Sequence, residues 1–96
     1  MNTIFEWDEA KARSNLHKHG ISFEAATLAF DDPDSVTELD RIEGGQYRWQ
    51  TIGVAFGVTL LLVAHTVEGE DIEVIRIISA RRAVPKERKR YEQQDR

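Results

Sequence analysis

The sequence predicts a small α+β domain in which helices pack on an antiparallel sheet. Two segments with helical apolar spacing lie near the N-terminus, and three long strand-like segments follow between residues 47 and 80. A basic segment with good helix formers closes the chain. The 96 residues are expected to form a single domain, residues 1–96.

The first helix is predicted over residues 8–19, after a short strand-like segment, Ile4–Trp7. Asp8 is its expected N-cap, because a carboxylate can accept hydrogen bonds from the free backbone N–H groups of the first turn. Ala12 and Leu16 are expected on its buried side.

The helix is expected to end in the stretch Asn15–Gly20, which reads NLHKHG. Basic side chains suit the negative end of a helix dipole, and Gly20 can adopt the left-handed conformation that ends a helix. His17 and His19 point in nearly opposite directions on a helix, so no shared metal ion is expected. Helix termination explains the stretch, while Lys18 or His19 could also project onto a functional surface.

A second helix is predicted over Phe23–Phe30, capped by Ser22, with Phe23, Ala26 and Phe30 on one face. It ends at the DDPD sequence, because proline disfavours helix in the residue before it.

An antiparallel meander of three to four strands follows. The expected strands are a short one at Ser35–Leu39 and three long ones at Tyr47–Phe56, Val58–Val67 and Ile72–Ala80. Turns are expected at residues 43–45, at Gly57 and at residues 68–71. The last helix is predicted over Pro85–Gln94, with proline at its first position.

The net charge of −4 hides a strong polarity along the chain. Residues 1–75 hold 5 Lys/Arg and 14 Asp/Glu, whereas residues 76–96 hold 8 and 3. The basic segment is either a solvated helix or a functional basic surface. There is no cysteine, no basic–apolar signal sequence at the N-terminus and no apolar run that could span a bilayer, so a cytoplasmic protein is expected.

Two further candidates for chemistry lie in the predicted strands. His65 shares the face of Leu61 and Val63, where it is either a half-buried structural residue or a general acid or base. Arg76 shares a face with apolar residues, including Ile78 and Ala80, in a strand expected to be central. Its guanidinium must therefore pair with a carboxylate or face an anion-binding groove.

More cations follow directly. They are Arg81, Arg82, Lys86, Arg88, Lys89 and Arg90, and Tyr91 could stack on a base. No phosphate loop, zinc-protease helix, nucleophile elbow or EF-hand loop is present. The residues are compatible with phosphate binding, or with RNA cleavage that uses proton transfer and cationic charge.

Two blocks of sequence resemble the BrnT family of bacterial toxins. The first runs from Phe5 to Lys11 and continues with Asn15 and with Lys18–Ala26. The second comprises Ile75–Ala83 and Glu87–Glu92, and His65–Thr66 falls where the family has a similar pair. The resemblance covers nearly the whole chain.

The resemblance implies a toxin of a type II toxin–antitoxin system with a fold like that of RelE-type ribonucleases. It implies RNA cleavage that blocks translation without a metal or another cofactor. It also implies a BrnA-like antitoxin with a ribbon-helix-helix part, which forms a hetero-oligomer with the toxin and contacts operator DNA.

On this basis Arg76 and Arg81 are predicted to stabilise phosphate charge, and Lys18, His19 and His65 to take part in proton transfer or backbone contact. Predicted RNA-binding residues are Arg82, Lys86, Arg88, Lys89 and Tyr91. Two alternatives stay open: a non-catalytic member that acts with its partner in autoregulation, and a housekeeping RNA- or phosphate-binding domain without a partner.

Overall fold

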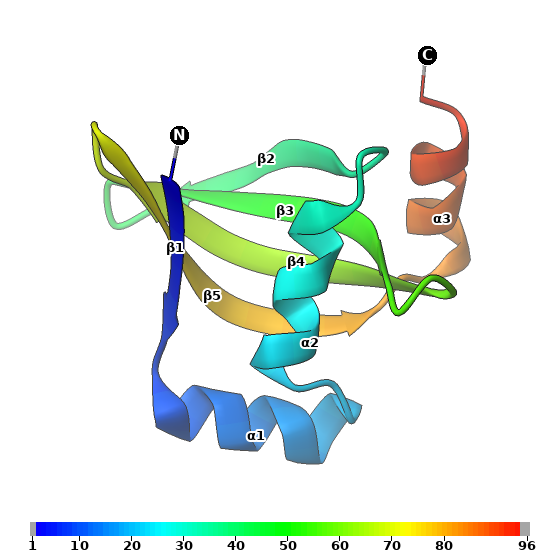
Figure 1. Cartoon of the computed structure of the whole chain (residues 1–96), viewed down its shortest axis with the longest axis horizontal. Coiled ribbons are helices and arrows are strands. Elements are labelled where there is room, and N and C mark those ends of the chain that lie inside the picture. Colours follow the sequence, from blue (N-terminus) through cyan, green and yellow to red (C-terminus); the bar gives the residue numbers. More distant parts are fainter. Residues whose placement is uncertain (1, 95–96) are drawn as a thin grey trace.

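Five strands form one mixed sheet in the order β1-β5-β4-β3-β2, shown in Figure 1. The computed structural model describes residues 2–94 of the predicted domain, so residues 1, 95 and 96 lie outside the description. The elements are β1 (Asn2–Trp7), α1 (Glu9–His19), α2 (Phe23–Thr27), the 3-10 helix η1 (Leu28–Asp31), β2 (Val36–Glu43), β3 (Gln46–Ala55), β4 (Thr59–Glu68), β5 (Ile72–Arg82) and α3 (Pro85–Glu92).

The α+β class is confirmed, but the predicted meander of three to four antiparallel strands is incomplete. β2, β3, β4 and β5 pair antiparallel as expected, whereas β1 pairs parallel with β5 from Asn2–Ile72 to Trp7–Ile77. The predicted strand-like segment Ile4–Trp7 therefore belongs to the sheet. Its partner lies 70 residues away, so no local pattern could reveal the pairing.

The capping chemistry of the helices follows the sequence. Asp8 accepts a hydrogen bond from the Lys11 backbone N–H at 3.0 Å, and Ser22 accepts one from Ala25 at 3.0 Å. The first of these bonds holds the pKa of Asp8 below its ordinary value. Gly20 ends α1 with φ = 72°, the left-handed conformation in which a side chain would be strained.

The second helix ends earlier than predicted. α2 stops at Thr27, and the chain continues as η1, where Ala29 lies against β3. A Cβ atom at Gly53 would overlap the carbonyl oxygen of Ala29, so glycine allows η1 to approach the sheet this closely.

Apolar clusters cover the two faces of the sheet separately. The face that carries Leu61 and Val63, called the front face, packs against α1, α2 and η1. The back face carries Leu60 and Leu62, which pack with Ile52 against α3. The sheet is therefore the middle layer between two unequal helical layers.

A β-bulge in β5 changes which residues share a face. The pairs with β4 shift from Ala64–Ser79 to His65–Ile77, which leaves Ile78 as an extra residue. The predicted common face of Arg76 and Ala80 is therefore wrong, because Ala80 pairs with Val63 on the front face. Simple alternation would separate Arg76 from Arg81, but the bulge places both on the back face.

Asn15, rather than Leu16, is the residue that α1 buries. Leu16 is 51% exposed, so its predicted burial is wrong. The Asn15 amide donates to the carbonyl oxygens of Ala80 at 2.8 Å and Ile21 at 2.9 Å. Its Oδ1 accepts from the Ala80 N–H at 3.0 Å. A side chain thus occupies the edge of β5 beyond the end of β1.

We predict that Asn15→Ala lowers the free energy of unfolding by about 2–4 kcal/mol, because three buried backbone groups lose their partners. Urea denaturation would measure the loss. Ser14→Ala, an exposed change in the same helix, should stay within about 0.5 kcal/mol of wild type. Equal stabilities of the two variants would contradict this role of Asn15.

Candidate functional site

A cationic cavity of about 280 Å³ lies between α1 and the free edge of β5. It forms because β1 stops pairing at Ile77, whereas β5 continues to Arg82. Among residues 2–94, the cavity is lined by Lys11, Ser14, Asn15, Lys18, His19, Ile78 and Ser79, and none of these carries a carboxylate. Such a lining is unusual in a chain with 17 Asp/Glu and 13 Lys/Arg, and it is suited to an anion.

Helical spacing brings the cations of this cavity together. Lys11 and Lys18 are seven residues apart in α1, and Ser14 and Asn15 lie between them on the same face. Half-buried His19 completes the lining at the end of the helix. The spacing of Lys11 and Lys18 is the signal that would have identified Lys11 from sequence.

His17 does not share this environment. It is exposed and does not line the cavity, as expected for a residue two positions from His19 on a helix. Within residues 2–94, no group of three or more His, Asp or Glu side chains is placed to hold a metal ion.

Arg76 lies on the back face and forms an ion pair with β1. Its Nη1 is 2.8 Å from Oε2 of Glu6, and both side chains are about half exposed. The predicted alternative of a carboxylate partner is thus confirmed. β5 is the second strand of the sheet and pairs on both sides, but the Arg76 side chain is 45% exposed, so the apolar surroundings expected for it are wrong.

Arg81 forms a bidentate pair with Glu87 of α3, with distances of 2.8 and 2.7 Å. The Glu87 side chain is only 10% exposed and also accepts from the Val84 N–H at 2.9 Å. The hydrogen bonds between the two side chains raise the pKa of Arg81 and lower that of Glu87. The pair therefore fastens α3 to β5.

Ser79 lies between the cationic cavity and the back face that carries Arg76 and Arg81. It lines the cationic cavity, and its pairing with Ala64 puts it on the back face between Arg76 and Arg81. Three predicted site residues, Lys18, His19 and Arg81, are therefore arranged around one end of β5. Ser79 was not among the predicted site residues, because its position depends on the bulge.

His65 lies on the opposite, front face, as its predicted alternation with Leu61 and Val63 required. It is 2% exposed; its Nε2 is 2.8 Å from Thr51 Oγ1, and its ring meets the edge of Phe30 with centroids 4.9 Å apart. Burial lowers the pKa of His65 to about 4, so the ring is neutral at pH 7. This geometry favours the structural interpretation of His65.

The predicted RNA-binding residues do not gather in one place. Arg82 pairs with Leu61 on the front face and lines an apolar cavity of about 290 Å³. Tyr91 packs on the back-face cluster and donates a 2.6 Å hydrogen bond to Asp32. The remaining three are exposed on α3: Lys86, Arg88 and Lys89.

None of the helices described is long and apolar enough to cross a membrane.

Comparisons with known proteins identify relatives of this arrangement. The sequence model of the family described as the ribonuclease toxin BrnT of type II toxin–antitoxin systems matches residues 7–87. The crystal structure of the Brucella abortus ribonuclease toxin BrnT is similar, with a TM-score of 0.60 and 23% sequence identity. The alignment covers 88% of this chain and 99% of that chain. At this identity, the likeness shows the fold. No curated protein matches the chain.

The buried histidine predicts a specific loss of stability in acid. The unfolded chain binds a proton at His65 below about pH 6.5, whereas the folded chain binds it only near pH 4. The folded state should therefore lose about 2 kcal/mol through this group between pH 7 and pH 5. Denaturation of His65→Gln at both pH values should lack this contribution, because glutamine does not titrate.

His17→Gln is the matched control, since His17 is exposed. It should keep the pH dependence of wild type. Identical acid sensitivity of His65→Gln and wild type would show that another group causes the loss.

Proposed function

Because the chain belongs to the BrnT family of ribonuclease toxins of type II toxin–antitoxin systems, we propose that it cleaves RNA at the cationic cavity between α1 and β5. The observation that carries this proposal is the gathering of Lys11, Lys18 and His19 in an acidic chain, with no carboxylate among the described residues that line the cavity. RNA cleavage through the 2′-hydroxyl needs a proton-transfer group and cations that stabilise the additional charge on phosphate.

The cavity residues have the chemistry for both tasks. His19 carries an imidazole, which can act as a general acid or base. Lys11 and Lys18 can stabilise charge on phosphate oxygens, and the Ser79 hydroxyl can donate a hydrogen bond to one of them. This set supplies proton transfer and electrostatic stabilisation from side chains, which supports cleavage without a metal.

Arg76 and Arg81 would extend the phosphate-binding surface along the back face beyond Ser79. Each is within 2.8 Å of a carboxylate, so phosphate contact requires an exchange of partners or a shared contact. Arg82, Lys86, Arg88 and Lys89 would provide weaker contacts to more distant phosphates. For His65 and Tyr91 we propose structural roles, because both are engaged inside the fold.

The biological role would follow from the family. We propose that RNA cleavage in the cytoplasm inhibits translation and that a BrnA-like ribbon-helix-helix antitoxin neutralises the chain. Operator DNA would be bound through the antitoxin. A non-catalytic partner-binding role in autoregulation is the second candidate, favoured by the carboxylate partners of Arg48, Arg76 and Arg81.

We predict that His19→Gln lowers the rate of RNA cleavage by about 10²–10⁴-fold if His19 transfers a proton. His17→Gln, two residues away and outside the cavity, should retain the wild-type rate. Cleavage of a single-stranded RNA by the purified proteins, followed over a range of pH, would measure both the rate and the loss of one titrating group.

Lys18→Gln tests charge stabilisation separately. It should reduce cleavage at every pH while leaving the shape of the pH profile unchanged. Equal activity of folded His19→Gln, His17→Gln and wild type would remove the cavity from the proposed mechanism. Absence of cleavage by all three, with the antitoxin still bound, would favour the non-catalytic role.

A further inference from the structure

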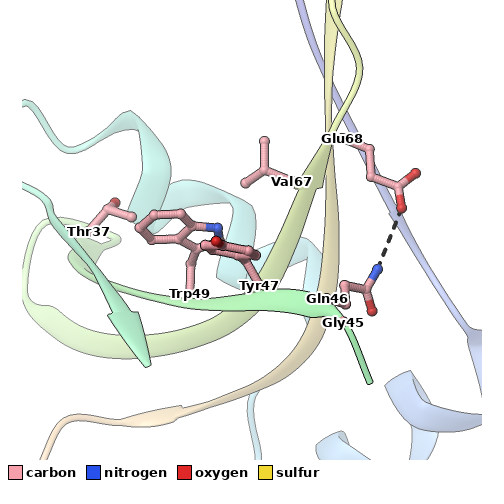
Figure 2. A pocket seen from close by; sticks show the side chains of 7 residues that line it. All are labelled: Thr37, Gly45, Gln46, Tyr47, Trp49, Val67 and Glu68. Atoms are coloured by element: carbon pink, nitrogen blue, oxygen red, sulfur yellow. Dashed lines mark hydrogen bonds between the residues drawn. The ribbon is translucent and has the colours of Figure 1, made fainter. Parts of the chain in front are cut away.

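An exposed aromatic groove lies on the front face at the end of the sheet where β5 begins. Its volume is about 520 Å³, and Thr37, Gly45, Gln46, Tyr47, Trp49, Val67 and Glu68 line it. Figure 2 shows the Tyr47 and Trp49 rings close together, with Val67 facing them from the neighbouring strand. Their ring centroids are 6.4 Å apart and their planes differ by 28°.

The groove belongs to a larger apolar surface that none of the helices within residues 2–94 covers. Leu39 pairs with Trp49 and Ile42 pairs with Tyr47, so these residues share the face of the two rings. Leu39, Ile42, Tyr47 and Val67 are between 40% and 56% exposed. A continuous apolar surface of this kind on a small domain marks an interaction site.

The surroundings of the groove are acidic. Four carboxylates follow Val67 around the β4–β5 turn: Glu68 at the end of β4, Glu70 and Asp71 in the turn, and Glu73 in β5, without any Lys or Arg among them. No lysine occurs between Lys18 and Lys86. The neighbouring Arg48 lies 3.2 Å from Glu43, and Arg41 lies 3.3 Å from Glu43 and 3.8 Å from Asp40, so two carboxylates balance the two guanidinium groups.

The negative charge around the groove favours one kind of binding partner over others. Exposed aromatic rings can stack on bases, but acidic surroundings repel the phosphates of RNA. A second copy of this chain is also disfavoured. A two-fold contact buries the same patch on both subunits, so the carboxylates of the two copies would repel each other. A protein segment with apolar and basic side chains fits the groove best, because the apolar side chains can pack on the rings and the basic ones can pair with the carboxylates.

We propose that this groove binds the antitoxin through a basic amphipathic segment of that protein. The proposal rests on the proposed function, because it takes the partner from the toxin–antitoxin assignment. RNA and the antitoxin would then bind at different places on the molecule. RNA binds at the cationic cavity beside Ser79, and the antitoxin binds at the acidic aromatic groove beside Val67. The antitoxin could then bind without entering the cavity.

Two matched substitutions test the groove. Val67→Glu and Val58→Glu add the same charge to an exposed valine, but Val58 lies in the β3–β4 turn and does not line the groove. Binding of the antitoxin encoded beside this gene would be measured by titration calorimetry. Val67→Glu should weaken it at least about tenfold, whereas Val58→Glu should stay within about twofold.

A charge variant tests the acidic surroundings. Glu70→Lys combined with Asp71→Lys should slow association and reduce its dependence on salt concentration. Thermal unfolding of each variant would show that the protein is folded. Weakened binding in Val58→Glu but not Val67→Glu would overturn the proposal, as would unchanged binding in all variants.

RNA cleavage by the same variants keeps this proposal separate from the nuclease assignment. Free Val67→Glu should cleave RNA as wild type does but resist neutralisation. A loss of cleavage in Val67→Glu with normal antitoxin binding would assign the groove to RNA instead. Absence of cleavage in wild type would count against the nuclease only, since the binding comparison still tests the groove.

Discussion

The amide pair between Asn15 and Ala80 is the interaction on which the arrangement of this molecule depends. β1 covers the edge of β5 only as far as Ile77, and the following backbone groups would otherwise form an open strand edge. The Asn15 side chain satisfies both the N–H and the carbonyl group of Ala80 and also reaches Ile21. One buried amide therefore occupies this edge at Ala80 and fixes α1 and the loop after it. The cationic cavity exists because α1 is held beside this edge without continuing the sheet.

Charge is separated along β5. The strand begins beside the four carboxylates around the β4–β5 turn and ends at Arg81 and Arg82, next to the cavity that contains Lys11 and Lys18. The net charge of −4 is an average over an acidic region where β5 begins and a basic region where β5 ends. A polyanion and a basic protein segment would be drawn to different places on one small domain. This separation reconciles an acidic chain with membership of a ribonuclease family.

On the back face, contacts within the protein fix the position of Arg81. Glu87 fixes Arg81 with two hydrogen bonds, and the same contact attaches α3 to the sheet. Tyr91 attaches the other end of α3 through Asp32, whose Oδ2 also accepts from the Val54 N–H at 2.9 Å. The C-terminal helix is therefore part of the fold rather than a free basic tail. Its fixed position limits how far Arg81 can move toward a phosphate without disturbing Glu87.

Elements whose causes are local could be predicted from the residues alone. Asp8 and Ser22 begin their helices as N-caps, and Gly20 ends α1 in the left-handed conformation. The alternation of β3 and β4 follows from the pleat. The resemblance of the motif blocks identified the family, which the comparisons confirmed. The tertiary structure decided what depends on distant contacts: the parallel pairing of β1, the role of Asn15 and the cavity. The bulge at Ile78 placed Arg76 and Arg81 on one face, which regular alternation could not predict. An extra residue in a strand is set by its pairing with neighbouring strands and leaves no periodic signal in the sequence.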